Sequence, residues 1–417
     1  MSTFITETLK TPVIADADVV VMGGGPAGVT AAIAAARLGA DVILIERWGH
    51  LGGQATGGLV IEFFGASDGA THEWGRKIKA GLYEECLERL RPYAAVTRFP
   101  DVLIHPEYLK LVYQQMIMEA GVKPMTHSIA VSATIEDDKI ASVQVENKSG
   151  RGAVLGKVFV DGTGDADSAK WCGVPYELLS ADQLKPVTMV YRFGNVDIKR
   201  AQKFKKENPQ EYATVVEQSK EELGFSLAWN PTMNKGEVWT DEAHIFGIDC
   251  SKAEDMMKSE FWGRERAVAA FEFYRKHVPG FEEATWVDTA PQMGTRESRR
   301  IRGVYWLTSE ECETGRMFED TIVLNPFRPR GSGHIFAIPY RCLVPRAGPK
   351  NLLFSGRCIS VAHDVLDWMR EIPSCACLGQ AAGTAAALAL EVKCDVGAVD
   401  TTRLRTTLVD AGAILEV

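Results

Sequence analysis

The sequence contains no apolar run that is both long and unbroken enough to cross a lipid bilayer. Of the two most apolar stretches, residues 19–45 are interrupted by glycines, Arg37 and Asp41, and residues 378–392 are too few to span the hydrocarbon core. The first 18 residues include four charged side chains, so they lack the apolar segment of a secretory signal peptide. We therefore expect a cytoplasmic protein without a membrane span.

The sequence also has no excess of basic over acidic residues. The chain has 417 residues and carries 46 Lys and Arg against 55 Asp and Glu, which gives a formal net charge of −9. Proteins that bind a nucleic-acid backbone usually present a basic face to it. The most basic segment, residues 199–206, has the composition of an exposed helix face. We expect no nucleic-acid partner.

The nine cysteines follow neither the pattern of a disulfide framework nor that of a metal centre. Their number is odd and they are scattered along the chain, which is typical of reduced thiols. Only Cys375 and Cys377 are close in sequence, and C-A-C differs from the C-x-x-C spacing of redox dithiols and from iron–sulfur ligand sets. We expect two buried thiols beside the start of a helix, and no metal site.

A βαβ unit around a glycine-rich turn is present near the N-terminus. Residues 19–22 and 42–45 are short apolar runs that predict buried parallel strands, and residues 27–38 between them predict an alanine-rich helix. The sequence GGGPAG at residues 23–28 matches G-x-G-x-x-G. Glu46 ends the second strand about twenty residues later, where an acid can accept hydrogen bonds from a ribose. This context predicts a dinucleotide site.

Each glycine of the turn has a separate expected task. Gly23 permits the tight turn, Gly25 lets the backbone approach a pyrophosphate, and Gly28 lets helix and strand touch. The helix N-terminus supplies free N–H groups and the positive end of the helix dipole to the phosphates. The turn alone does not distinguish FAD from NAD.

Three groups of residues resemble the FAD-binding proteins of the glutathione-reductase type. They are Glu46-Arg47 followed by LGGQ at 51–54, DGTGDAD at 161–167, and NLLFSGR at 351–357 followed by LGQAAG at 378–383. In that family the first segment runs beneath the isoalloxazine ring, and the last places a helix N-terminus at the flavin pyrimidine ring. The resemblance implies that the cofactor is FAD.

The chain also resembles a broad, mostly bacterial family of FAD-dependent oxidoreductases through GTRESRRIRG at residues 294–303 and IPYRCLVP at residues 338–345. The resemblance implies an oxidase or dehydrogenase that transfers hydride between a small organic substrate and flavin N5. A family of this kind shares chemistry and not one substrate. The related fold of the glucose-inhibited division protein family leaves a tRNA-modifying or nucleic-acid-associated flavoprotein as the alternative. A disulfide reductase that uses NAD(P) needs a second G-x-G-x-x-G and a cysteine pair, and the sequence shows neither.

The expected fold is α/β, with a Rossmann-like FAD-binding domain made of a parallel sheet, helices and a small β-meander. Alternation of apolar and polar residues predicts the meander within residues 122–160, and helices are predicted over residues 74–89, 106–120 and 378–392. After about residue 175 the composition changes to charged helices and aromatic-rich strands, which predicts an inserted α+β substrate domain.

The domain boundaries follow from these composition changes. The FAD-binding domain is expected to comprise residues 15–172 and 346–395, the inserted substrate domain residues 173–345, and a C-terminal segment residues 396–417.

Candidate catalytic residues are those expected near the flavin. His363 follows the Gly356-Arg357 turn and precedes the expected flavin helix, His334 lies in a glycine-rich segment, and His72 lies in the loop after the first motif. Imidazole is the usual group that moves a proton near neutral pH, and guanidinium groups grip carboxylates with two parallel bonds. The predicted catalytic residues are His363, His334, Arg370 and Arg296.

The residues expected to hold FAD all come from the motifs above. They are Gly23, Gly25, Pro26, Ala27, Gly28, Glu46, Arg47, Gly52, Gly53, Gln54, Thr163, Gly164, Asp165, Gly356, Arg357, Gly379 and Gln380. The expected partners are a small-molecule substrate, for which a carboxylate is one option, and an electron acceptor that is oxygen, a quinone or a protein. Whether the chain forms a homo-oligomer stays open.

Overall fold

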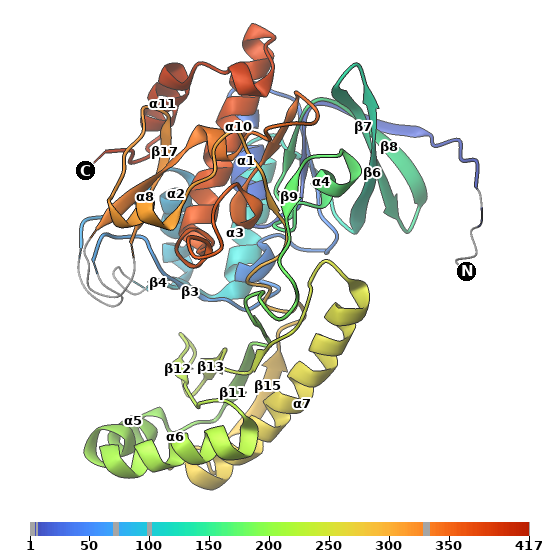
Figure 1. Cartoon of the computed structure of the whole chain (residues 1–417). Coiled ribbons are helices and arrows are strands. Elements are labelled where there is room, and N and C mark those ends of the chain that lie inside the picture. The colour runs from blue at the N-terminus through green and yellow to red at the C-terminus, as the bar shows by residue number, and fades with distance from the viewer. Residues whose placement is uncertain (1–4, 6, 70–74, 98–101, 328–333, 417) are drawn as a thin grey trace.

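The computed structural model describes residues 5, 7–69, 75–97, 102–327 and 334–416 of the chain. Figure 1 shows two lobes: a larger one that carries both ends of the chain, and a smaller one joined to it by extended segments. The smaller lobe has a hydrophobic core of its own, built from residues between Tyr191 and Ala284.

A seven-stranded sheet forms the centre of the larger lobe. Its path is β5 (Lys123–Met125), β2 (Val42–Ile45), β1 (Val13–Met22), β8 (Gly150–Asp161), β7 (Lys139–Asn147) and β6 (Ser128–Glu136), and β19 (Leu352–Phe354) pairs with the end of β8. The pairs β5–β2, β2–β1, β1–β8 and β8–β19 are parallel, whereas β6, β7 and β8 form an antiparallel meander. The predicted Rossmann-like sheet with its meander is confirmed.

Two long helices pack against each other on this sheet, α1 (Pro26–Arg37) and α10 (Ile372–Val392). Small residues on α10 allow the close approach. A Cβ added at Gly379 would lie 2.0 Å from a carbonyl oxygen of α1, and one added at Gly383 would also lie 2.0 Å from such an oxygen. The glycines of α10 therefore serve contact between the helices.

Helix α10 differs from its prediction in length. It begins at Ile372 and not near Leu378, with Pro373 in its first turn, a position that suits proline. At 21 residues it is long and apolar enough to cross a membrane, so the expectation that this segment is too short was wrong. However, 78% of its most apolar window is buried inside the protein, as in a core helix. Its apolar composition is explained by packing against α1.

Two further helices, α2 (Leu82–Leu90) and α3 (Pro106–Glu119), complete this layer. The second agrees with its prediction. The first was expected to begin at residue 74, but residues 75–81 are not helical. Gly81 has a φ of 67° and a ψ of −134°, a conformation that favours glycine and is not helical, so the helix starts only after it.

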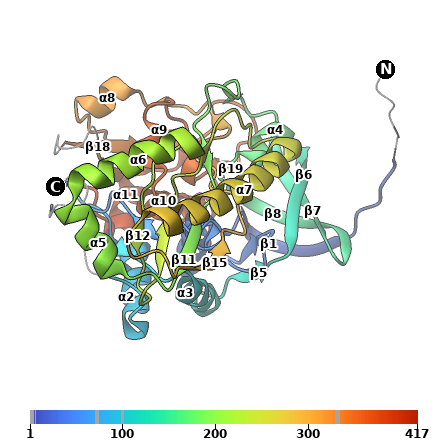
Figure 2. The same ribbon diagram turned by 90° about the horizontal axis from the view of Figure 1, so that it is seen from below.

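The smaller lobe combines a four-stranded antiparallel sheet with three helices. The strands are β12 (Asn230–Pro231), β13 (Val238–Thr240), β11 (Tyr191–Gly194) and β15 (Thr285–Thr289). The helices are α5 (Ile198–Glu207), α6 (Pro209–Leu223) and α7 (Ala253–His277). Figure 2 shows them along the outer side of the lobe, and α7 packs its buried face on the sheet.

The chain returns to the larger lobe well before residue 345. Strand β16 (Arg300–Ile301) pairs with β9 (Tyr176–Glu177), and the hairpin of β17 (Thr321–Pro326) and β18 (Ile335–Pro339) lies against α10. The core of the smaller lobe thus covers a shorter segment than the proposed insertion, whose boundaries stay a prediction. Short elements complete the fold: β3 (Glu62–Phe63), β4 (Val102–Leu103), α4 (Asp167–Trp171), β10 (Val187–Thr188), β14 (His244–Ile245), α8 (Ser309–Glu313), α9 (Leu366–Met369) and α11 (Thr401–Asp410).

Candidate functional site

A cavity of about 360 Å³ lies at the carboxyl ends of the parallel strands and extends to the smaller lobe. One part is lined by residues 46–48 and 128–130, and the next by the glycine-rich turn, residues 162–165 and residues 356–357. The part beyond these is lined by β10, β13, residues from 292 to 296 and the first turn of α10. Ligands of open α/β sheets bind at this edge of the sheet.

The three glycines of the turn differ in the space around them. A Cβ added at Gly23, whose φ is 94°, would lie 2.7 Å from the carbonyl oxygen of Gly162. One added at Gly28 would lie 1.7 Å from the carbonyl oxygen of Gly23. At Gly25 the nearest atom would be the Cα of Gly53, 4.0 Å away. Each glycine has the surroundings that its expected task requires, and only the one at 25 faces open space.

Glu46 is the buried acid at the end of β2. Its Oε2 accepts a hydrogen bond from the N–H of Gly24 at 2.6 Å, and its Oε1 accepts one from the N–H of Trp48 at 2.8 Å. Burial raises the pKa of the Glu46 carboxyl, although these two N–H groups oppose the rise. Each carboxylate oxygen has a second lone pair, so the side chain can hold the turn and still accept from a ribose hydroxyl.

The turn after β8 is held by Asp161, an acid that sequence reasoning did not single out. Its side chain is fully buried and accepts hydrogen bonds from the N–H and hydroxyl groups of Thr163 and Ser168, at 2.6 to 3.0 Å. These bonds fix the Thr163-Gly164-Asp165 turn against the cavity. Its position as the last residue of an otherwise apolar strand end is the sequence signal that could have identified it.

Arg357 joins this turn to the segment after β19. Its guanidinium lies 2.7 Å from Asp165 Oδ1, and the side chain is only 12% exposed. The other terminal nitrogen, Nη1, is buried without a hydrogen-bond partner among the described residues. Because such a group is costly to leave unpaired, an acceptor oxygen of a ligand in this cavity would stabilise it. The pyrophosphate or ribityl chain of a dinucleotide fits this requirement.

Most of the residues predicted to hold the cofactor line this cavity. Those that do are Gly23, Gly25, Pro26, Ala27, Glu46, Arg47, Gly53, Gln54, Thr163, Gly164, Asp165, Gly356 and Arg357. Gly28, Gly52, Gly379 and Gln380 lie outside the lining.

Gly52, Gly379 and Gln380 lie outside the cavity lining for different reasons. Gly52 donates its N–H to the carbonyl oxygen of Gly24 at 2.8 Å and so fixes the loop behind the turn. Gly379 contacts α1, and Gln380 accepts a hydrogen bond from the N–H of Leu82 at 2.8 Å, which caps the start of α2. The residues of α10 that reach the cavity are in its first turn, because the helix begins earlier than predicted.

Two of the predicted arginines, Arg296 and Arg370, line the far part of the cavity together. Arg296 donates to the carbonyl oxygen of Pro186 at 3.0 Å and to Thr188 Oγ1, and lies 3.4 Å from Asp241. Burial, and next the charge of Arg370, lower the pKa of Arg296. The two guanidinium groups are therefore close enough to repel each other.

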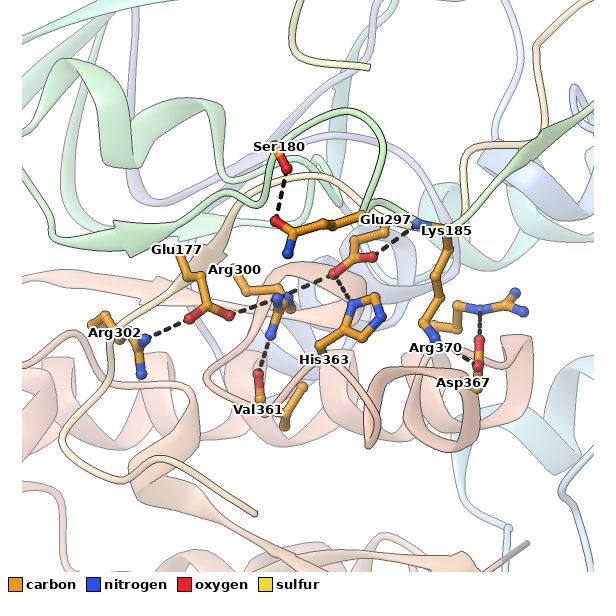
Figure 3. A network of polar contacts seen from close by, with 11 residues as sticks. Glu177, Ser180, Lys185, Glu297, Arg300, Arg302, Val361, His363, Asp367 and Arg370 are labelled. Atoms are coloured by element: carbon orange, nitrogen blue, oxygen red, sulfur yellow. Dashed lines mark hydrogen bonds and ion pairs between the residues drawn. The ribbon is translucent and has the colours of Figure 1, made fainter. Parts of the chain in front are cut away.

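The two predicted histidines are not part of the cavity lining. His363 Nδ1 lies 2.9 Å from Oε1 of the fully buried Glu297, as Figure 3 shows. Glu297 also accepts a hydrogen bond from the N–H of Lys185 at 3.1 Å. His334 is exposed at the start of β18. His72 lies outside the described residues. A catalytic role for any of the three stays a prediction.

The other arginines of the segment 294–303 serve the ionic network of Figure 3 or the turn after β8. Arg300 is buried and pairs with Glu177 at 2.6 Å and with Glu297 at 3.1 Å. Arg302 also pairs with Glu177, and Arg299 pairs with Asp167. Of the four arginines in this segment, only Arg296 lines the cavity.

Comparison with known proteins agrees with this geometry. The chain matches the family model of FAD dependent oxidoreductases over residues 18–408. The chain belongs to this family. FAD is its cofactor, and the match gives no support to the tRNA-modifying alternative.

Two curated relatives match shorter parts of this family member. It is 38% identical over 112 residues to an NADH oxidase of Thermoanaerobacter brockii. This match covers 27% of the present chain and 15% of that protein. It is 23% identical over 194 residues to a digeranylgeranylglycerophospholipid reductase of Thermoplasma volcanium. This match covers 43% of the present chain and 48% of that protein. The matches thus span less than half the length of either relative.

A solved structure shares the fold. The crystal structure of a geranylgeranyl bacteriochlorophyll reductase-like protein from Thermoplasma acidophilum superposes with a TM-score of 0.51 at 14% identity, covering 95% of this chain and 84% of that one. At this identity the likeness concerns the fold alone.

Proposed function

We propose that this oxidoreductase transfers a hydride between a carbon of a small organic substrate and bound FAD, in the part of the cavity next to the smaller lobe. The observation that carries the proposal is the continuity of the cavity. Its dinucleotide-binding part, at the glycine-rich turn and Arg357, continues into a part lined by β10, β13 and the first turn of α10. When bound, FAD supplies the hydride chemistry at N5.

The chain contributes charge stabilisation and exclusion of water. The N-terminus of α10 carries free N–H groups and the positive end of the helix dipole, which stabilise negative charge in the cavity. Apolar side chains along the same part keep water away from the reacting carbon, and they are Val60, Phe64, Val190, Trp239, Met256 and Ile372.

Oxidation of a substrate also releases a proton. His363 is the predicted group to receive it, although this residue lies outside the cavity lining. Pairing of Nδ1 with Glu297 orients the ring, and Nε2 lies on its opposite side. Asparagine cannot titrate, so H363N should keep its FAD and lose about 10²–10⁴ in turnover. Flavin reduction within a few-fold of wild type would show that His363 is a structural partner of Glu297.

The proposed function is tested on the purified protein in two steps. Cofactor released by acid is identified by chromatography, and we expect FAD rather than FMN. The loaded protein is then mixed without oxygen with a library of small organic metabolites, and loss of the oxidised-flavin absorbance reports hydride transfer. Reduction of the flavin by none of these compounds, with FAD present, would contradict the proposal.

A further inference from the structure

We propose that the far part of the cavity contains a carboxylate-binding subsite formed by Arg296, Arg370 and the indole N–H of Trp239. This inference rests on the proposed function, because it names the substrate class of the same site.

The first observation is the pair of guanidinium groups. The Arg296 and Arg370 side chains are 17% and 24% exposed, and both line the cavity. Each lies 3.4 Å from an aspartate, a long distance for an ion pair. Burial, and next the charge of Arg370, lower the pKa of Arg296, so the two cations repel each other. An anion between them would offset this repulsion. A carboxylate matches the fork of donors that each guanidinium presents.

The indole of Trp239 supplies a hydrogen-bond donor that carries no charge. Trp239 is 4% exposed and lines the cavity, and its Nε1 is buried without a hydrogen-bond partner among the described residues. Trp239 belongs to β13, and Asp241, which reaches Arg296, follows the end of this strand; both residues line the cavity. The indole and the Arg296 guanidinium therefore border the same cavity. Two guanidinium groups and an unpaired indole N–H around one cavity favour a ligand group that only accepts hydrogen bonds.

The acids near the arginines limit the charge of the ligand. Asp241 lies near Arg296, and Asp367 is bound at 2.7 Å by Lys185 as well as facing Arg370. Glu371 also lines the cavity and has an interaction of its own. Cations and acids are thus nearly balanced. This balance favours a singly charged carboxylate over a doubly charged phosphate ester.

The test uses the FAD-loaded protein with benzoate as the probe, benzamide as its neutral match and inorganic phosphate as a second anion. Binding is followed by calorimetry and by the change in the flavin spectrum. We expect benzoate to bind at least about tenfold more tightly than benzamide or phosphate, because charge-assisted hydrogen bonds are lost with either substitute.

Variants assign the effect to residues. R296Q and R370Q should each weaken benzoate binding by about tenfold or more and leave benzamide binding unchanged, whereas W239F should weaken benzoate by a few-fold. R296K and R370K keep the charge without the fork and should lie between. The control is R200Q on α5, whose side chain is 58% exposed and pairs with Glu282, and it should bind benzoate like wild type.

Three results would overturn the subsite. They are no benzoate binding by the wild type, unchanged benzoate binding in both R296Q and R370Q, and loss of FAD from these variants, which would make the arginines cofactor ligands. If FAD is retained and metabolites still reduce it, the proposed hydride transfer stands although the carboxylate subsite fails. If benzoate binds as expected and no metabolite reduces the flavin, the subsite stands and the proposed function fails.

Discussion

The glycines of the cofactor turn have different roles, and substitutions distinguish a role in FAD binding from a role in stability. Gly25 has φ −70° and no atom within 4.0 Å of an added Cβ except the Cα of Gly53 at that distance. We predict that G25L folds but fills the pyrophosphate position, so its affinity for FAD falls at least about tenfold. G28A places a methyl group 1.7 Å from the carbonyl oxygen of Gly23 and should lose about 1–3 kcal/mol or more of stability. Thermal unfolding and FAD titration of both apo variants distinguish the outcomes. A G25L protein with normal FAD affinity would contradict the assignment.

Asp167, which lines the cavity, makes the stability of the protein depend on pH. Burial and the charges of Asp165 and Asp161 raise its pKa to about 6 from 3.8, although Arg299 opposes them. Between these two values the folded protein binds a proton here that the unfolded chain does not. Stability therefore falls as the pH rises through this range, and the loss is complete above about 6.

The variant D167N removes this cost. Relative to wild type it should be more stable above pH 6, and the difference should vanish as the pH falls to about 4. Because the side chain is 43% exposed, solvent screening limits the difference to about 1 kcal/mol. Denaturant unfolding across this pH range measures it, and a difference that does not change with pH would show that Asp167 does not titrate as described.

At the scale of elements, contact between α1 and α10 brings two helix N-termini to one cavity. We predict that G383A, whose methyl group would lie 2.0 Å from a carbonyl oxygen of α1, lowers the free energy of unfolding by about 1–3 kcal/mol. G397A is the matched control, since its methyl group would meet nothing closer than 3.4 Å. Equal thermal unfolding of both variants would mean that the helices can separate without cost.

Sequence patterns predicted the elements with strong local signals. The strand at 42–45 and the helix from Pro106 were placed correctly, because an unbroken apolar run and a proline at a helix start are local features. The starts of α2 and α10 were misplaced. The conformation of Gly81 and the packing of α10 on α1 depend on distant parts of the chain, which the local pattern does not contain.

The same limit applies to the site. Motifs located the residues around the glycine-rich turn, since their tasks follow from backbone geometry within a few residues. The partners of His363 and the unpaired N–H of Trp239 were not predicted, because they depend on how the two lobes and the segment after β15 fold together. Arg296 and Arg370 were named from their chemistry, and only the structure places them in one cavity.

At the scale of the whole molecule, the sequence contains one dinucleotide motif and no second G-x-G-x-x-G. We therefore predict that NADPH and NADH reduce the flavin slowly, and that electrons pass to oxygen, a quinone or a partner protein. The NADH oxidase relative does not oppose this, because the match covers only 15% of that protein. Anaerobic mixing with each nucleotide tests the prediction, and rapid reduction by micromolar NADPH would falsify it.

The most direct test of the central claim is anaerobic reduction of the bound flavin by small carboxylic acids that carry a hydroxyl or amino group, each compared with its amide. If the cavity binds FAD in one part and an anionic substrate in the next, some of the acids will bleach the flavin and their amides will do so at least about tenfold more slowly. R296Q should remove that preference. Bleaching by neutral compounds alone, or equal rates for acids and amides, would contradict the account.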